Sequence, residues 1–306
     1  MLKKIFLGSL ILIFVISGQV LADFPVSVTD DLNHKVTLEK KPTRIISLAP
    51  ANTEFLFALG LEKEIVGVTT YANYPKEALE KEKIGTVIEP NIEKIVSLEP
   101  ELILSNAVNK LETVKRLREL GYNVAGFNAR TVDEAIIMIK KVAKLAGREE
   151  RGREIVTEMY LQLAEIKNLV DNKLKVNNRP RVFYEIWNDP LYTAGKNTFI
   201  NDIVHIAGGV NIGAKARGEW PQYSLEKLLI VNPDIYISSP HSAPHKVTVK
   251  SIKNRANYQT INAVKNNKIY ILDQDIVSRP SPRIIEGIKE MTKAIFPDLA
   301  DEINNL

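Results

Sequence analysis

The sequence predicts an α/β protein made of two lobes, each built around a mostly parallel sheet, that are joined by a single long helix. Three observations predict this fold: strand-like runs alternate with helical segments in two separate series, a short unit recurs once in each series, and one amphipathic helix lies between them. The chain of 306 residues, with 45% hydrophobic and 25% charged residues, has the size and composition of about two globular domains.

The first series indicates an N-terminal lobe over residues 23–147. Its strand-like runs are separated by helical segments, which is typical of a parallel sheet with helices on both faces. We expect Asn52-Thr53-Glu54, after Pro50, to cap a helix that Gly60 ends. The expected strands are Val36–Leu38, Arg44–Leu48, Ile65–Thr69, Leu102–Ser105 and Asn123–Phe127.

The second series indicates a C-terminal lobe over residues 174–306, with strands expected at Arg181–Ile186, Ile235–Ser238 and Lys268–Leu272. Between the two series we predict a connecting helix over residues 148–173, because apolar residues recur there at spacings of three and four. A helix is a stiff connector, so we expect only small movements of one lobe against the other. The apolar face of this helix consists of Ile155, Met159, Leu163, Ile166 and Val170.

An internal repeat supports the two-lobe interpretation. The segment Ile92–Asn106 aligns without gaps with Leu225–Ser239, and the same offset relates Gly85 to Gly218. Each copy predicts a capped short helix, a proline turn and a buried strand. The identical pairs are Glu93/Glu226, Lys94/Lys227, Pro100/Pro233 and Ser105/Ser238.

The first residues are typical of a secretory signal peptide. Lys3 and Lys4 precede an uncharged apolar stretch, and Val20 and Ala22 lie three and one residues before the expected cut. A membrane anchor needs roughly 20 apolar residues, more than this stretch has. We therefore expect residues 1–22 to be removed and the rest to be exported.

The composition excludes several classes of site. With no cysteine, the chain has no disulfide, thiolate zinc site, cysteine nucleophile or lipid attached through a cysteine. The net charge of +4 comes without a basic block, so we expect no nucleic-acid partner. An exported protein without a lipid anchor is best retained by a second membrane, so we expect the chain to diffuse freely in the periplasm. We also expect it to be a monomer.

Motifs of enzymes and metal sites are mostly missing. The sequence has no G-x-S-x-G, H-E-x-x-H or G-x-G-x-x-G. Gly208 and Gly213 have the spacing of a phosphate loop, but Ala214 stands where its lysine belongs. His241 and His245 have the spacing of helical metal ligands, but interleaved prolines favour a solvated loop. We expect no catalytic residue and no metal site, and an exported hydrolase or metal-dependent enzyme is the alternative from another class.

Aromatic and polar residues follow several of the expected strands. Ligands of open α/β sheets bind beyond the carboxyl ends of the strands, where these side chains fall. For each aromatic residue alone, packing in the core or on the surface explains its position as well as contact with a ligand does. Together these residues favour a large, partly flat ligand in a cleft between the lobes. Asn52, Asp275 and Arg279 would supply polar contacts. The other residues placed there are Pro50, Tyr71, Trp187, Trp220 and the loop from Asp273 to Arg279.

Two acids of the repeat have two explanations. Glu93 and Glu226 each fall in the first turn of an expected helix, where the helix dipole stabilises a carboxylate by roughly 0.3–1 kcal/mol. One acid on each lobe at equivalent positions also suits a partner with two symmetric basic sockets. Sequence geometry alone does not decide between these explanations.

Taken together, these motifs resemble a known family over essentially the whole mature chain: the class III periplasmic substrate-binding proteins of ABC importers for cobalamin, haem and iron–siderophore complexes. The segments that carry the resemblance are Asp31–Leu38, Arg44–Glu54, Phe57–Gly60, Ile65–Gly67 and Ile92–Leu104. A more specific likeness, to the cobalamin-binding members, is in Thr70–Pro75, Trp220–Ser224 and Ser281–Ile285.

The resemblance implies two Rossmann-like lobes and a receptor that delivers a corrinoid to an ABC permease without chemistry on it. It implies that Glu93 and Glu226 engage arginine sockets on the two transmembrane subunits. The alternative ligand is haem or an iron–siderophore, whose metal Tyr71, His241 or His245 would approach. Residues at ligand-contact positions of the family are Tyr71, Trp220, Asp275, Ile276, Val277, Ser278 and Arg279; Val87, Asn106 and Ile276-Val277 replace aromatic residues of the cobalamin binders, leaving less stacking surface.

Overall fold

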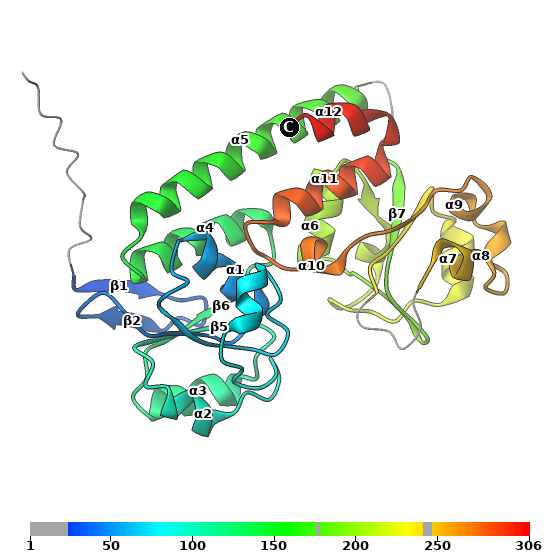
Figure 1. The fold of residues 1–306 in the computed structure, drawn as a ribbon. Coiled ribbons are helices and arrows are strands. Elements are labelled where there is room, and N and C mark those ends of the chain that lie inside the picture. The colour runs from blue at the N-terminus through cyan, green and yellow to red at the C-terminus, as the bar shows by residue number, and fades with distance from the viewer. Residues whose placement is uncertain (1–23, 176–177, 241–246) are drawn as a thin grey trace, which may run out of the picture.

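A computed structural model shows two α/β lobes with one long helix, α5, running along both of them (Figure 1). The structure describes residues 24–175, 178–240 and 247–306. The expected signal peptide, residues 1–22, and the two histidines His241 and His245 lie outside the described residues. None of the described helices combines the length and the apolar character needed to cross a membrane.

The N-terminal lobe is built on a four-stranded parallel sheet in the order β4-β3-β5-β6. Its strands coincide with four of the predicted runs. The remaining predicted strand, Val36–Leu38, corresponds to β2. It pairs with β1 in a separate antiparallel ribbon, in which Val26 lies opposite Leu38. The bounds are β1 Val26–Thr29, β2 Lys35–Leu38, β3 Ile45–Ser47, β4 Ile65–Val68, β5 Leu102–Asn106 and β6 Val124–Phe127.

The C-terminal lobe contains a five-stranded mixed sheet in the order β11-β10-β7-β8, with β9 also paired to β7. All pairs are parallel except β7 with β8, which form an antiparallel hairpin. The three predicted strands are confirmed, and β8 and β9 are additional. The bounds are β7 Arg181–Asn188, β8 Leu191–Thr193, β9 Val210–Asn211, β10 Ile235–Ser238 and β11 Ile269–Ile271.

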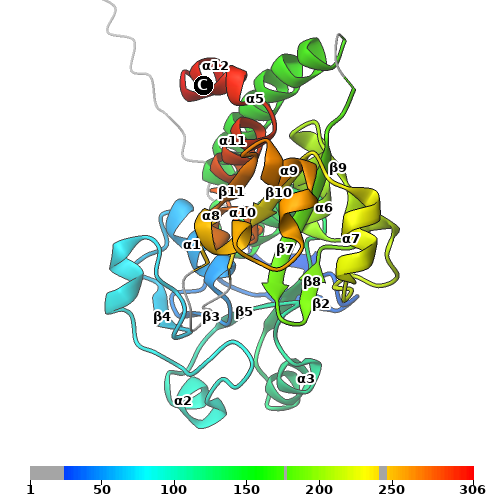
Figure 2. The same cartoon turned by 90° about the vertical axis from the view of Figure 1, so that its right-hand side faces the viewer.

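Short helices cover both sheets, and Figure 2 shows α2 and α3 together at the end of the N-terminal lobe farthest from α5. The helices of this lobe are α1 Pro50–Ala58, α2 Ile92–Ser97, α3 Leu111–Glu119 and α4 Val132–Leu145, with a 3₁₀ turn at Lys76–Glu80. Those of the C-terminal lobe are α6 Phe199–Ile206, α7 Leu225–Val231, α8 Val249–Lys253, α9 Asn262–Lys265, α10 Gln274–Val277, α11 Ile284–Ile295 and α12 Ala300–Asn304, with 3₁₀ turns at Ile212–Lys215, Tyr258–Thr260 and Pro297–Leu299.

The connecting helix α5 covers Glu149–Leu174, where the apolar spacing predicts a helix. Its 26 residues correspond to a length of about 39 Å. Along its predicted face, Ile155, Met159, Ile166 and Val170 are buried. They belong to one apolar core that continues from the N-terminal sheet, past α4 and α5, into α6 and α11. The lobes are therefore joined by shared packing as well as by the helix itself, which favours small movements between them.

The start of α1 differs from the prediction. The helix begins at Pro50 after an N-cap at Ala49, so Asn52-Thr53-Glu54 lies inside it and is buried. Proline is well tolerated at the first helical position because its missing N–H has no partner there. The predicted cap was wrong. The hydroxyl of Thr53 instead lies 2.8 Å from the hydroxyl of Ser47, and Glu54 bonds to the other lobe, as described below.

The helix starts of the internal repeat match in the structure. Asn91 caps α2 by accepting the backbone N–H of Lys94, and Ser224 caps α7 by accepting that of Lys227. Such caps each stabilise a helix by about 1 kcal/mol.

The turns of the repeat match as well. Glu99 and Asn232, at equivalent positions before the prolines, have left-handed φ angles of 45° and 50°. Gly85 and Gly218 have φ angles of 99° and 101°, which favour glycine. The repeat predicted from sequence therefore extends to backbone conformation.

Candidate functional site: the cleft between the lobes

A cavity of about 860 Å³ lies between the two lobes. Its N-terminal wall is formed by the loops that follow β3, β4 and β5, and its C-terminal wall by the segment from β11 through α10. Its position beyond the carboxyl ends of parallel strands is the expected one for a ligand in open α/β sheets. The volume is within the range of small-molecule sites.

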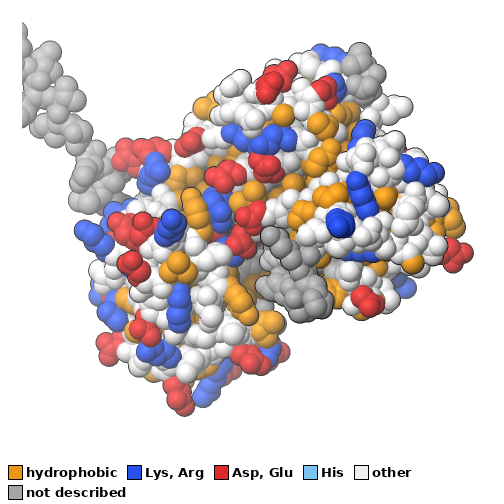
Figure 3. Space-filling view, turned by 45° about the vertical axis from the view of Figure 1, so that its right-hand side comes forward, with side chains coloured by type: hydrophobic (Ala, Val, Ile, Leu, Met, Phe, Trp, Pro, Cys, Tyr) orange, Lys and Arg blue, Asp and Glu red, His pale blue; other side chains and the backbone are white. Residues whose placement is uncertain are grey.

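The N-terminal wall is mainly apolar. Tyr71, which follows β4, is 57% exposed, and Ile88 and Val108 are exposed to a similar degree. Pro50, at the start of α1, also lines the cavity. Figure 3 shows hydrophobic side chains along the edge of the N-terminal lobe that faces the other lobe, with charged side chains of both signs spread over the outer surface. Exposed apolar side chains around a cavity are typical of a binding surface.

Two further residues of this wall are those that the sequence resemblance places at aromatic positions of the cobalamin-binding members. Val87 and Asn106 both line the cavity. Among the described lining residues, Tyr71 is the single aromatic side chain. The cleft therefore offers one ring for stacking and more open space than an aromatic-lined cleft would.

The C-terminal wall carries the charged side chains of the cavity, and they centre on Arg279. Its guanidinium forms an ion pair with Asp275 at 2.7 Å, and donates hydrogen bonds to the side-chain oxygen of Asn73 at 2.7 Å and to Glu54 at 3.0 Å. The Asn73 amide in turn donates to Asp275 at 2.8 Å. Ser278 also lines the cavity. The bonds to Asn73 and Glu54 cross from one lobe to the other.

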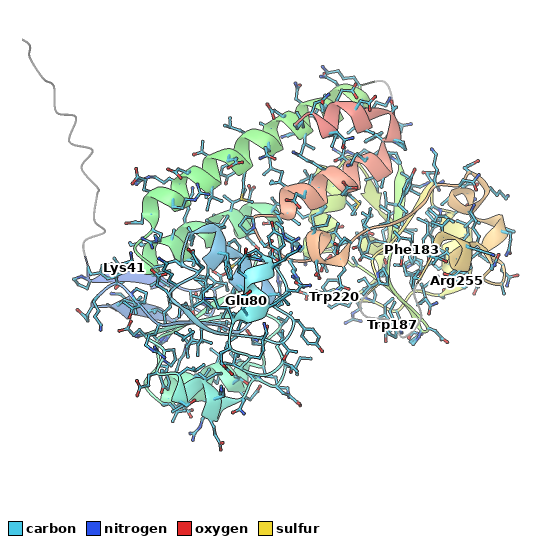
Figure 4. All side chains as sticks on the ribbon, in the orientation of Figure 1. Lys41, Glu80, Phe183, Trp187, Trp220 and Arg255 are labelled. Carbon is cyan, nitrogen blue, oxygen red and sulfur yellow. The ribbon has the colours of Figure 1, made fainter. Side chains whose placement is uncertain are left out.

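Five of the predicted site residues do not line this cavity. Asn52 is fully buried, so a direct contact with a ligand in the cleft is not available to it, and neither side-chain polar atom has a protein partner. Val277, the last residue of α10, is also fully buried, because it packs in the apolar core. Ile276 beside it is half-buried against that core. Trp187 and Trp220 are exposed on the C-terminal lobe but outside the cavity (Figure 4).

The residue before Trp220 nevertheless contacts the other lobe. Glu219 forms an ion pair with Arg130 of the N-terminal lobe at 3.0 Å, with both side chains about half exposed. A second contact joins the lobes near the start of α4, where the carboxylate of Asp202 accepts the backbone N–H of Val132 at 2.8 Å. Burial raises the pKa of Asp202.

Glu54 is the functional candidate that sequence reasoning missed. We expected it to cap α1, but its carboxylate is buried and accepts hydrogen bonds from Arg279, Ser281 and Arg283, all of the C-terminal lobe. Burial would lower the pKa of Arg283, but the hydrogen bond and charge of Glu54, with smaller contributions from Glu286 and Tyr74, together raise that pKa. The available signal was an acid placed directly before Phe55 and Leu56 of the core.

The two acids of the repeat are exposed, as their first-turn positions suggest. Glu93 begins α2 and Glu226 begins α7, each one residue after the first position of its helix. Both helices lie at the ends of their lobes distant from α5 (Figure 1). The positions suit contact with a partner that spans both lobes, and the helix dipole explanation stays equally open on this geometry.

Two α/β lobes, a cleft between them and a long connecting helix define a receptor of the class III binding-protein type. The chain belongs to the periplasmic binding protein family, whose sequence pattern matches residues 45–276. This confirms the resemblance and the fold class predicted from the sequence.

Relatives agree with this membership. The chain is 35% identical over 284 residues to the uncharacterized ABC transporter substrate-binding lipoprotein YvrC of Bacillus subtilis, covering 91% of this chain and 88% of that protein. The crystal structure of the periplasmic vitamin B12 binding protein BtuF of Vibrio cholerae is similar with a TM-score of 0.73 and 28% identity, over 85% of this chain and 98% of that one. The apo periplasmic heme-binding protein RhuT from Roseiflexus sp. RS-1 has a TM-score of 0.75 at 26% identity, over 83% and 98% of the two chains.

Proposed function

We propose that this chain, as the substrate-binding component of an ABC importer, captures a corrinoid in the cleft and delivers it to the permease. The observation that carries the proposal is the cleft itself: an interlobe cavity of about 860 Å³ with an apolar wall around Tyr71 and a polar wall around Arg279. A corrinoid has a broad apolar ring system with amide groups at its edge, which matches one apolar and one hydrogen-bonding wall. The similarity to the vitamin B12 binding protein of Vibrio cholerae supports the choice.

The second candidate ligand is haem or an iron–siderophore. The similarity to the heme-binding protein RhuT favours it, as does the presence of Val87 and Asn106 where cobalamin binders have aromatic residues. In this case the exposed phenol of Tyr71 is the described side chain that would approach the metal. The metal would belong to the ligand and not to the protein.

Delivery requires a surface that the permease reads. We propose that Glu93 and Glu226 of this chain dock it to the permease, each contacting one of the two transmembrane subunits. Both glutamates are exposed and occupy equivalent positions in the repeat. Exposed charges at the rim of an interface set orientation and association rate more than affinity. We further propose that the chain is exported without a cysteine-linked lipid, since its sequence contains no cysteine.

Titration calorimetry with cyanocobalamin, cobinamide, haem and ferric siderophores tests the ligand. The expected result is binding of one corrinoid per chain, with the ligand recovered chemically unchanged after prolonged incubation. Binding of haem or a ferric siderophore alone would replace the corrinoid by the second candidate. A ligand recovered in altered form would favour the enzyme alternative.

A further inference from the structure

Glu54 is a buried carboxylate that one lobe contributes and the other lobe neutralises. Its side chain is 2% exposed. It accepts hydrogen bonds from Arg279 at 3.0 Å, from the hydroxyl of Ser281 at 2.7 Å, and from Arg283 at 2.9 and 2.8 Å. All three donors lie in the segment that joins α10 to α11. An ion buried to this degree requires such donors, because their loss would leave its charge uncompensated.

The same carboxylate orients the polar wall of the cleft. Arg279, which lines the cavity, is held on one side by Glu54 and on the other by Asp275 and Asn73. Arg283 lies directly behind it, with its guanidinium 3.7 Å from the ring centre of Tyr74. Glu54 therefore fixes one arginine in the wall and a second behind it.

The charges around this wall leave no excess positive charge. Among the described residues, the charged side chains that line the cavity are Asp273, Asp275 and Arg279, and the two directly behind them are Glu54 and Arg283. Three acids thus face two arginines. A ligand with carboxylates, such as haem with its two propionates, would meet an Arg279 whose charge is already balanced by Glu54 and Asp275, so the acids would repel it. Neutral amide groups can hydrogen-bond to the same side chains without that repulsion.

We propose that Glu54 is a positioning and specificity-determining residue, which locks the two lobes together, holds Arg279 in the cleft wall and makes the cleft select amide-bearing over carboxylate-bearing tetrapyrrole-like ligands. This inference rests on the proposed function, because it assumes a ligand of that class in the cleft. It adds the residue and the charge balance that set the choice.

The first test compares the dissociation constants of cyanocobalamin and haem for the wild-type chain and for Glu54→Gln. Removing one negative charge from behind Arg279 is expected to shift the ratio of the two constants by about tenfold in favour of haem. An unchanged ratio would overturn the specificity claim.

The matched control is Glu185→Gln. Glu185 is an equally buried glutamate paired with Arg255, but all its partners lie within the C-terminal lobe. We expect this variant to lower the melting temperature without changing the ratio. An equal shift of the ratio in the control would overturn the proposal, because it would reflect general loosening of the fold.

Two variants keep the test valid if Glu54→Gln does not fold. Asp275→Asn removes a partly exposed acid from the same wall and is expected to shift the ratio in the same direction; no shift would contradict the charge argument. Glu54→Asp keeps the charge on a shorter side chain, and is expected to retain the wild-type ratio. If Glu54→Asp shifted the ratio as much as Asp275→Asn does, the charge argument would be contradicted.

A second measurement needs no ligand, so it separates this proposal from the proposed function. The chain has no cysteine, so spin labels can be attached at Lys115→Cys on α3 and Lys250→Cys on α8, both exposed. The distance distribution between them is expected to broaden with Glu54→Gln and to stay narrow with Glu185→Gln. An unchanged distribution would overturn the interlobe lock even if corrinoids bind, whereas broadening without corrinoid binding would overturn only the ligand assignment.

Discussion

The two lobes contain the same helix, turn and strand unit but use their buried glutamates differently. In the C-terminal lobe, Glu185 of β7 bonds to Arg255, Tyr236 and Ser238, all of the same lobe. In the N-terminal lobe, Glu54 takes its arginines from the other lobe. The pair of Glu185 with Arg255 thus stabilises the C-terminal lobe internally, whereas the pairs of Glu54 with Arg279 and Arg283 join one lobe to the other. Figure 4 shows Arg255 on the part of the C-terminal lobe away from the N-terminal lobe.

The largest expected effect comes from replacing the two acids of the repeat. The double variant Glu93→Arg and Glu226→Arg reverses one charge on each lobe and should reduce uptake through the cognate permease by about tenfold or more, while ligand binding stays normal. Uptake of labelled cobalamin by cells that carry the permease measures it.

Glu150→Arg is the control for that variant. It reverses an exposed acid in the first turn of α5, and therefore removes the same favourable helix dipole interaction without touching α2 or α7. We expect normal uptake. Normal uptake in the double variant as well would leave the dipole as the explanation of both glutamates.

The next largest effect concerns the internal network of the C-terminal lobe. Glu185→Gln leaves the partly buried Arg255 without its charge partner and should lower the free energy of unfolding by about 3 kcal/mol. Urea denaturation measures it, with Glu154→Gln as a control because that residue pairs with Arg151 on the exposed surface. Equal losses in the two variants would show that burial of the pair is not what matters.

A smaller effect tests the apolar wall of the N-terminal lobe. Tyr71→Ala should weaken corrinoid binding by about 2- to 10-fold, the loss expected for one stacked ring. Tyr160→Ala removes another exposed ring, on α5 and outside the cleft, and should leave the affinity unchanged. Equal affinities for wild type and Tyr71→Ala would remove Tyr71 from the site.

The smallest effect compares acids at equivalent positions of the repeat. The hydrogen bond from Lys40, with those from Thr43, lowers the pKa of Glu101 to about 2, and Arg181 lowers the pKa of Asp234. A carboxyl with a lowered folded pKa adds stability that is present above its unfolded pKa of about 4 and lost as the pH falls through the folded value.

Glu101→Gln should therefore flatten the loss of stability between about pH 4.5 and 2, and Asp234→Asn should flatten the loss that begins below about pH 4. The expected size is about 0.5 kcal/mol, because solvent screens Lys40, which is 77% exposed, and the partly exposed Asp234. Melting temperatures across this pH range measure it. An unchanged slope for either variant would show that its ion pair does not contribute to the stability of that lobe.

Local sequence patterns were sufficient for most of the fold. The apolar spacing of α5, the alternating strands and the repeat of α2 and α7 depend on neighbours along the chain, and each was predictable. The start of α1 was not, because its cap is Ala49, whose side chain gives no signal. The pairing of β2 with β1 in a separate ribbon depends on tertiary packing and not on local propensity.

The site was predictable to the level of loops but not of side-chain partners. Tyr71 and the loop of Asp275 and Arg279 line the cleft because they follow strands, a rule that sequence position can supply. The bonds of Glu54 could not be predicted, since its partners lie far away along the chain in the other lobe. Nor does strand position reveal that Asn52 points into the interior.

A crystal structure of the chain with cyanocobalamin tests the central claim most directly. The account predicts one corrinoid between the lobes, with its ring system against Tyr71 and its amide groups on the wall formed by Asp275 and Arg279. It also predicts that the bonds of Glu54 to Arg279 and Arg283 persist in the complex. A corrinoid bound outside the cleft, or a cleft whose walls separate at Glu54 to admit it, would contradict the account.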